Sequence, residues 1–238
     1  MTTRSHARPH AAFDNLPAEK RARIVELAID EFAGRPYSQA SLSRIVARAG
    51  IAKGSIYQYF PNKLELYRWL VTRELVDRKR AMLAAVVTPP GGDVFARLEQ
   101  MVYAGMRFQL DDPRLARLAA NLYDPDVDPD VHAMHRELRA TGQASVRALL
   151  EEARREGTLP KSTDLDVAAP LVAQVLGPGL AEVLLGRMGT DLHGYLKDPS
   201  VARSLKETEL RALVRSVVGV LRHGLAGEAP KAKKERGR

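Results

Sequence analysis

Three short stretches near the N-terminus constrain the fold most, because each carries apolar residues at helical spacing and is bounded at one end by a residue that starts or stops a helix. The first covers residues 17–33, and the second covers residues 42–49 and ends at Gly50, where a left-handed conformation is favoured. The third covers residues 53–60 and stops before Pro61, since the residue before a proline avoids the α conformation. Two short helices joined by a glycine predict a helix-turn-helix.

The rest of the chain also carries helical patterns, and no segment shows the convincing alternation of a strand. Asn62 with Glu65 forms an N-cap and capping-box pattern, which predicts a long fourth helix to about Val87. Residues 88–93 hold two prolines and two glycines and break the pattern, and residues 187–205 are expected to be irregular. Further helices are expected near residues 94–110, 113–123, 131–156, 164–186 and 206–225. The sequence therefore predicts an all-α fold.

The composition favours a folded cytoplasmic protein. Hydrophobic residues make up 45% of the chain, and the absence of Cys excludes disulfides, thiolate metal sites and Cys nucleophiles. The N-terminus lacks the apolar run of a signal peptide, and no stretch approaches the roughly 18 consecutive apolar residues of a membrane span. We expect a soluble protein with no membrane partner, a disordered N-terminal arm at 1–16 and a basic disordered tail at 226–238.

The net charge of +8 is unevenly placed along the chain. Residues 1–80 carry a net charge of +7, residues 81–225 carry −2, and residues 226–238 carry +3. A basic first third on a nearly neutral body indicates a polyanionic partner at one end. Solvated surface Lys and Arg would give the same balance, so the charge alone leaves both interpretations open.

The third predicted helix has a face that packing alone does not explain. Ile56 and Phe60 are four residues apart and face inward, so Gly54 and Gln58 lie on the opposite side. A helical Gly costs about 1 kcal/mol relative to Ala, which suggests that another molecule approaches this backbone closely. Gln can form a bidentate bond to adenine, and Tyr, Ser and Lys reach phosphates or base edges. The face predicts DNA contact, and a small aromatic core helix is the alternative.

These residues carry a family resemblance. The segment SLSRIVARAGIAKGSIYQYFPNKLELY, with KRARIVELAIDEF before it, resembles the DNA-binding region of the TetR family of bacterial transcriptional regulators over about residues 18–78. The resemblance implies an all-α homodimer in which an N-terminal three-helix helix-turn-helix domain, 17–63, is joined by a long helix to a helical ligand-binding and dimerisation domain, 64–225. It implies a ligand-responsive regulator, most often a repressor, that a small apolar or amphipathic effector releases from double-stranded palindromic operator DNA.

The resemblance also implies a set of DNA contacts. Ser41 would cap the second helix beside a phosphate, Arg44 would reach the backbone or a base, and Lys63 would hold a phosphate with help from a helix dipole. The recognition surface would be formed by Lys53, Gly54, Ser55, Tyr57, Gln58 and Tyr59.

Three positions depart from the family pattern. Ala52 stands where a capping Ser or Thr is usual, so the start of the third helix is weaker. Tyr59 replaces the commoner His, which would make a phosphate contact phenolic. Pro36 stands where Gly is common and cannot take a positive φ, so we expect a turn built around Gly34 instead.

The last two long predicted helices have the features of a homodimer interface. The helix at 164–186 carries small residues that allow close approach, and the helix at 206–225 has too much apolar surface to face solvent alone. Two copies of the pair would form an isologous interface and set the recognition helices about 34–36 Å apart. Burial of both helices within a monomer is the alternative. The expected interface residues are Ala169, Ala173, Gly177, Ala181, Leu210, Leu213, Val214, Val217 and Leu221.

The resemblance places a ligand between the helices of the body, which is larger than a DNA-binding unit requires. A ligand would act through the fourth helix by favouring a state whose recognition helices are too far apart. The kink at 177–179 would be part of the ligand site or only a packing feature. Taken singly, each candidate lining residue is better explained as core. The candidates are Phe95, Met101, Tyr103, Phe108, Leu122, Tyr123, Met134, Leu138, Leu171, Val175 and Leu176.

Other classes of function find less support. The chain has no P-loop, HExxH, GxSxG or dinucleotide-binding glycine motif, so we expect no enzymatic activity and no cofactor. His132 and His135 follow the acidic segment 124–130 and could suggest a metal, but Asp–Pro pairs are typical of turns, and we expect no metal. A DNA-binding scaffold of the same fold with no small-molecule ligand stays open, and a solid C-terminal core would favour it.

Overall fold

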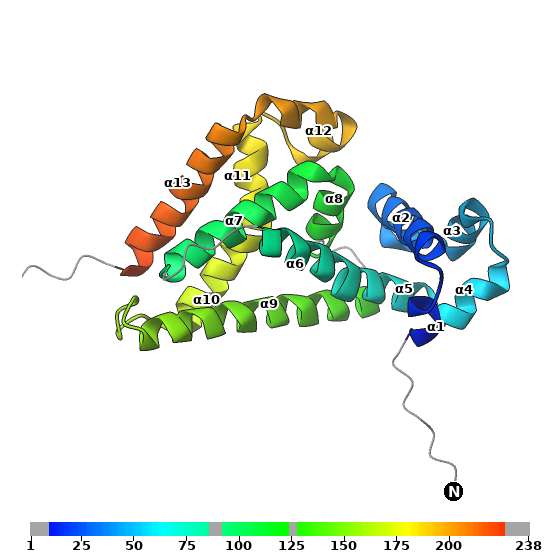
Figure 1. Cartoon of the computed structure of the whole chain (residues 1–238), viewed down its shortest axis with the longest axis horizontal. Coiled ribbons are helices and arrows are strands. Elements are labelled where there is room, and N and C mark those ends of the chain that lie inside the picture. The colour runs from blue at the N-terminus through cyan, green and yellow to red at the C-terminus, as the bar shows by residue number, and fades with distance from the viewer. Residues whose placement is uncertain (1–9, 86–91, 124–127, 227–238) are drawn as a thin grey trace, which may run out of the picture. The chain divides into compact units, whose positions relative to one another are not determined.

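The computed structural model describes residues 10–85, 92–123 and 128–226, and every regular element within these ranges is helical (Figure 1). The all-α fold predicted from the sequence is confirmed.

The chain divides into two compact units. The N-terminal unit comprises residues 1–80 and 112–138, and the C-terminal unit comprises residues 81–111 and 139–238. The chain therefore passes from one unit to the other at 80/81, 111/112 and 138/139. Each unit is formed from two separate stretches of the chain, whereas the expected domains were consecutive. The functional boundary after residue 63 stays a prediction.

The N-terminal unit is built around the helix-turn-helix, and two of its helices, α6 and α9, run on into the C-terminal unit. Its elements are α1 (Ala11–Asp14), α2 (Ala18–Gly34), the 3₁₀ turn η1 (Tyr37–Gln39), α3 (Leu42–Ala49), α4 (Lys53–Tyr59), α5 (Lys63–Trp69), the π turn η2 (Leu70–Glu74), α6 (Leu75–Ala85), α8 (Pro113–Asn121) and α9 (Pro129–Arg155).

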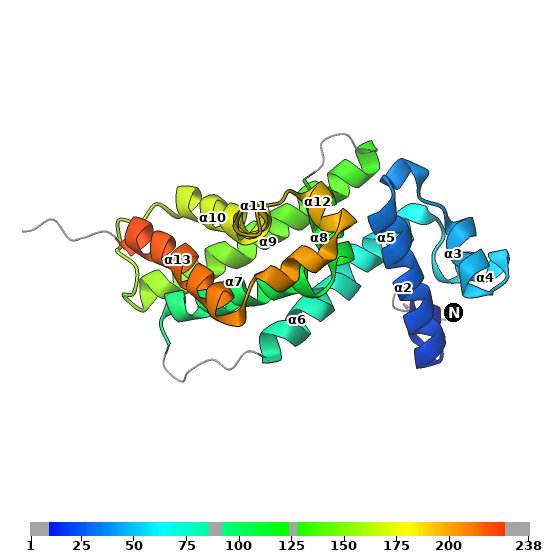
Figure 2. The same ribbon diagram turned by 90° about the horizontal axis from the view of Figure 1, so that it is seen from above.

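In the C-terminal unit, α13 runs alongside α7 in both ribbon views (Figures 1 and 2). The elements are α7 (Val94–Asp111), α10 (Leu165–Gln174), the π turn η3 (Val175–Gly179), α11 (Leu180–Arg187), α12 (Leu192–Lys197), the 3₁₀ turn η4 (Pro199–Ser204) and α13 (Glu207–Ala226).

Local sequence signals predicted the first helices closely. Gly50 follows α3 with φ 69°, the left-handed conformation that the sequence favours there. The Asn62 side chain accepts a hydrogen bond from the Glu65 amide at 2.9 Å, as an N-cap should. The fourth predicted helix begins at Lys63 and continues through the π turn of η2 to Ala85, and the expected break at 88–93 lies mostly outside the described residues.

Three expectations about irregular segments were wrong. The segment 187–205 contains α12 and η4, because Asp191 and Asp198 each cap a short turn with their carboxylates. The arm expected to be disordered over 1–16 is helical at Ala11–Asp14, where Phe13 is fully buried. The turn after α2 does not use a positive φ at Gly34, since Arg35 is extended at φ −147° and Pro36 then opens η1.

Each unit has its own core. The N-terminal unit packs aromatic rings, with Phe13 against Phe60 at 4.9 Å and against Trp69 at 5.0 Å between ring centroids. The C-terminal core is mainly aliphatic and is drawn from α7, α9, α10, α11 and α13, with Leu98, Leu150 and Val218 among its buried members.

The helices α10, α11 and α13 also expose apolar side chains. Val167, Leu171, Val183 and Val220 are 55%, 61%, 40% and 74% exposed. The segment Leu165–Arg187 is long and apolar enough to cross a membrane by length and composition alone, with a mean hydropathy of 1.6, although no unbroken apolar run of that length was found in the sequence. Only 28% of that window is buried, so the segment presents apolar surface available for contact.

Candidate nucleic-acid interface

The candidate interface is the outer side of α4. Figures 1 and 2 both show α3 and α4 as neighbours at one end of the N-terminal unit. Ile45, Ile56 and Phe60 are buried at 1%, 0% and 0% exposure, and they turn the inner sides of these helices into the core. The opposite side of α4 is thereby left to solvent.

The structure places most of the predicted recognition residues on that outer side. Lys53, Gly54, Tyr57 and Gln58 are exposed, Tyr57 at 46%. Ser55 is half-buried. A Cβ added at Gly54 would meet no atom within 4 Å, so packing inside the chain does not require glycine there. Ala52 precedes α4 and provides no capping hydrogen bond, in agreement with the weaker helix start expected from the sequence.

Tyr59 is turned toward α1, which the sequence did not reveal. Its carbonyl lies 3.1 Å from His10 Nδ1, and its ring centroid lies 5.8 Å from that of Phe13. Tyr59 is consequently half-buried. The short run AAFD gives no periodicity from which such a helix could be recognised.

Arg44 has an internal partner that the sequence comparison did not suggest. Its Nε and Nη2 atoms donate to Glu31 Oε1 at 2.9 and 2.6 Å. Glu31 lies in α2, thirteen residues away, and is only 1% exposed. The guanidinium is therefore held against α2, and any contact with DNA must use its remaining N–H groups.

Glu31 also binds the backbone of Ser41, the residue that precedes α3. The Ser41 side chain makes no capping hydrogen bond, so that part of the prediction is wrong, while the Ser41 amide donates to Glu31 Oε1 at 2.9 Å. Burial would raise the pKa of Glu31, but the hydrogen bonds from Arg44 and the Ser41 amide, with the charges of Arg44 and Arg35, hold that pKa below its usual value. The group is an anion at neutral pH.

Lys63 is tied to the turn before α3. Its Nζ donates to the carbonyls of Tyr37 and Ser38 at 2.7 and 3.3 Å and lies 4.2 Å from the centroid of the Tyr37 ring. Burial lowers the pKa of the Lys63 ammonium. The amino group fastens η1 to the start of α5, and its predicted phosphate contact stays a prediction.

A small cavity of about 40 Å³ lies inside the N-terminal unit. The Tyr67 hydroxyl and His135 Nε2 meet at its wall, 3.2 Å apart. Burial and, next, the charges of Asp128 and Asp130 raise the pKa of Tyr37 at the same wall to about 12. The lining residues are Phe32, Pro36, Tyr37, Tyr67, Arg117, Asn121, Val131 and His135.

None of the residues predicted to line a ligand site borders this cavity. Four of them, Leu122, Tyr123, Met134 and Leu138, belong to the N-terminal unit, and the other seven belong to the C-terminal unit. Leu171 is 61% exposed on α10, so its assignment to an interior site is wrong. Within the described residues, no group of three His, Asp or Glu side chains could hold a metal ion.

The helices of the predicted dimer interface stay a prediction, but some of the residues assigned to it are wrong. Ala169, Leu210, Val214 and Leu221 are between 1% and 8% exposed, buried in the core of their own unit. The helix α13 packs against α7 of the same chain, and Ala169 of α10 lies in the same buried core, so these four residues are unavailable to a partner. The exposed apolar side chains of the same helices lie at other positions, namely Val167, Leu171, Val183 and Val220.

Comparison with known proteins extends these observations. The family model "Bacterial regulatory proteins, tetR family" matches residues 24–69, from α2 to the end of α5. The HTH-type transcriptional repressor BepR of Brucella suis is 28% identical over 196 residues, which cover 79% of this chain and 93% of that protein. The probable acrEF/envCD operon repressor of Escherichia coli K12 is 25% identical, covering 73% of this chain and 80% of that protein.

Among solved structures, a TetR family transcriptional regulator from Chloroflexus aurantiacus superposes with a TM-score of 0.67. It is 30% identical and covers 91% of this chain and 98% of its own. The similarity therefore extends across both units.

Proposed function

Because the chain belongs to the TetR family of bacterial transcriptional regulators, we propose that it is a homodimeric repressor that reads a palindromic operator with α4 and leaves it when a small apolar or amphipathic molecule binds. As a DNA-binding regulator it works in the cytoplasm, where its operator lies, and it has no catalytic role.

The outer side of α4 is the observation that carries this proposal. Gly54 has no packing reason to be glycine, and beside it Tyr57 and Gln58 extend from the helix into solvent. A bare helix backbone flanked by an amide and a phenol suits the major groove, where side chains read base edges. Gln58 is the residue to which we assign base discrimination.

In vitro selection from random double-stranded DNA with the full-length protein tests the assignment. We expect a palindromic site with half-sites about 10 base pairs apart, or a multiple of that spacing. Gln58→Ala should cost about 1–3 kcal/mol at one base position and relax the preference there. A Gln58→Ala protein with unchanged affinity and base preference would contradict the orientation of α4.

Exposed apolar surface supports the homodimer. Val167, Leu171 and Val183 lie on α10 and α11, and Val220 lies on α13, the helices predicted to pair. Isologous pairing would bury this surface and present two copies of α4 to one duplex.

The effector is proposed from the family and from the composition of the C-terminal unit. Aromatic and Met side chains such as Phe95, Met101 and Tyr103 can repack around an apolar ligand. Measuring operator affinity at saturating concentrations of candidate hydrophobic compounds tests this step. A compound that binds tightly and leaves operator affinity unchanged is not the effector, because equal affinity for both states shifts nothing. If no compound changes operator affinity, a DNA-binding scaffold of the same fold is the better description.

A further inference from the structure

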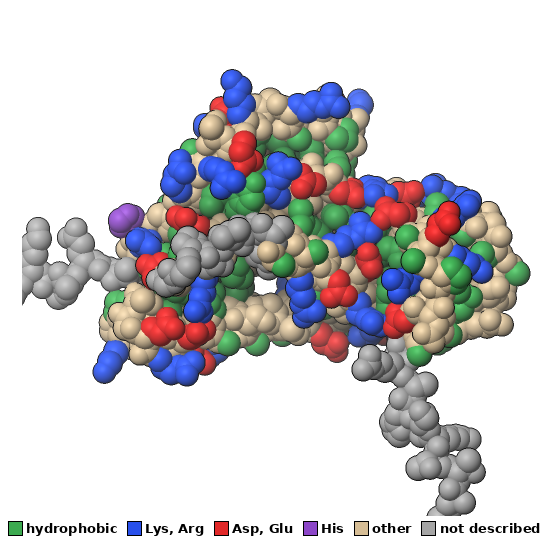
Figure 3. All heavy atoms as spheres, in the orientation of Figure 1, with side chains coloured by type: hydrophobic (Ala, Val, Ile, Leu, Met, Phe, Trp, Pro, Cys, Tyr) green, Lys and Arg blue, Asp and Glu red, His purple; other side chains and the backbone are tan. Residues whose placement is uncertain are grey.

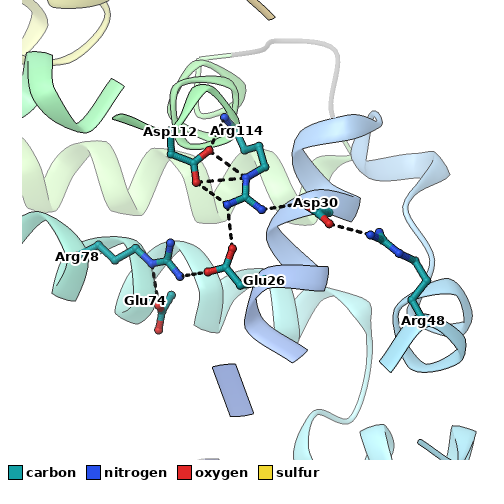
Figure 4. A network of polar contacts seen from close by, with 7 residues as sticks. All are labelled: Glu26, Asp30, Arg48, Glu74, Arg78, Asp112 and Arg114. Atoms are coloured by element: carbon teal, nitrogen blue, oxygen red, sulfur yellow. Dashed lines mark hydrogen bonds and ion pairs between the residues drawn. The ribbon is translucent and has the colours of Figure 1, made fainter. Parts of the chain in front are cut away.

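We propose that Arg114 is a positioning residue for operator recognition, which fixes α2 to the two segments where the chain first leaves and then re-enters the N-terminal unit. The proposal rests on the proposed function, since it assumes an operator. Arg114 belongs to a network of seven charged side chains, all within this unit (Figure 4): Glu26, Asp30, Arg48, Glu74, Arg78, Asp112 and Arg114.

Arg114 reaches both carboxylates that α2 presents to α8. Its Nη1 donates to Asp30 Oδ1 at 2.7 Å, and its Nη2 donates to Glu26 Oε2 at 2.8 Å. Glu26 and Asp30 are four residues apart and so share one face of α2. A single guanidinium therefore spans one turn of the helix that leads to the recognition helices.

Asp112 holds this guanidinium in place from its own helix. Its carboxylate accepts the Arg114 amide at 2.9 Å, which caps α8. It also accepts Arg114 Nε at 2.9 Å and Nη2 at 2.6 Å. The fork of Arg114 is thus oriented before it meets α2, and Lys could not reproduce this geometry.

Each α2 carboxylate has a second arginine. Arg78 of α6 donates to Glu26 Oε1 at 2.5 Å and to Glu74 at 2.8 Å. Arg48 of α3 donates to Asp30 Oδ2 at 2.8 Å. The network therefore connects α8 and α6 to α2, and through Asp30 it reaches α3 of the helix-turn-helix.

The position of these contacts along the chain gives them their role. Arg78 lies just before the passage at 80/81, and Arg114 lies just after the passage at 111/112. The arginine beside each passage therefore binds the same side chain, Glu26. A change in the C-terminal unit that moves either segment must be accommodated at α2.

Removing Arg114 should loosen this link without unfolding the unit. Burial would raise the pKa values of Glu26 and Asp30, but hydrogen bonds from the arginines hold both pKa values below the usual range. Without Arg114, Glu26 keeps Arg78 and Asp30 keeps Arg48, so neither carboxylate is left without a cation. The side chain of Arg114 is 37% exposed, so its contribution is geometric rather than a large share of stability.

The test measures how strictly the full-length protein requires its half-site spacing. The operator is first selected with the wild-type protein, and affinities are then measured for that site and for sites whose half-sites are moved by one base pair either way. The variants are Arg114→Gln, Arg114→Lys and Arg78→Gln. Arg147→Gln is the matched control, since Arg147 loses the same charge, is 43% exposed and pairs with Glu151 and Asp166 in the C-terminal unit.

We expect each of the three variants to lose about fivefold or more of the spacing discrimination, a typical size for coupling between separate parts of a protein. The slope of affinity against salt should stay unchanged, because no phosphate contact is lost. Arg147→Gln should behave as the wild type.

The proposal is overturned if Arg114→Gln and Arg114→Lys, shown to be folded by their unfolding curves, keep the wild-type discrimination. It is also overturned if Arg147→Gln loses as much, since the effect would then come from net charge. A wild-type protein that selects no DNA sequence overturns the proposed function itself, and this proposal with it.

Discussion

The guanidinium of Arg44 and the buried carboxylate of Glu31 form an ion pair that fastens the beginning of α3 to α2. The same carboxylate oxygen accepts a hydrogen bond from the Ser41 amide. One acidic side chain in α2 therefore orients the first helix of the helix-turn-helix and one of the cations beside the expected DNA surface.

Glu31→Gln should destabilise the protein. The amide removes the charge that Arg44 and Arg35 face, and a buried group with lost partners costs about 1–3 kcal/mol. Urea unfolding curves measure the difference. Asp77→Asn is the control, since the Asp77–Arg80 pair is exposed and should be worth less than about 1 kcal/mol. Equal effects of the two substitutions would show that the buried ion pair stabilises the protein no more than the exposed one does.

Acid should remove the contribution of Glu31. The folded protein holds the pKa of this group below the usual value of 4.5, so its stabilisation is fully present above that value and is lost as the pH falls through the lower folded value. The pKa values of Glu26 and Asp30 are also lowered in the folded protein, so the wild type should lose stability below about pH 4–5. Glu31→Gln should show a shallower loss in the same range, measured as unfolding free energy at a series of pH values. Parallel curves would contradict the assignment.

Gly54→Ala should separate stability from DNA binding. The new methyl group meets no atom of the chain, so the change should stabilise α4 by up to about 1 kcal/mol through helix propensity. The same methyl group would lie between the helix backbone and the groove, and operator affinity should fall. Thermal unfolding and operator titration on one preparation check both signs. A variant that is more stable and binds DNA as well as the wild type would exclude close backbone approach at this position.

Leu171→Glu should produce monomers at micromolar concentration. Leu171 is 61% exposed on α10, and a carboxylate there would have to be desolvated at a dimer interface. Sedimentation velocity measures the outcome, with His193→Glu on α12 as an exposed control in the same unit. If the variant still sediments as a dimer, the proposed contact surface on α10 is wrong.

The sequence predicted those parts of the fold that depend on near neighbours. Helices α2, α3 and α4 follow from apolar spacing and from residues such as Gly50 and Pro61, which act locally. The outer side of α4 followed from the same periodicity, because the inward positions of Ile56 and Phe60 fix which residues face solvent.

Contacts between distant residues could not be predicted in this way. Glu31 and Arg44 are thirteen residues apart, and α1 is placed by rings more than forty residues away. The buried face of α13 was wrongly assigned to a partner, since a single sequence does not show that α7 covers Leu210 and Val214.

The five-residue π turn at Leu70–Glu74 sets the direction in which the later residues of the same helix, including Arg78, point from the helix axis. A π turn holds one residue more than an α turn, and each residue turns an α-helix by about 100°. The π turn takes up this extra residue within one turn, whereas a regular α-helix through the same residues would swing Arg78 out of line with Glu26. Chimeric sensors that join this DNA-reading unit to another body should therefore be cut after Arg78, with the turn kept whole.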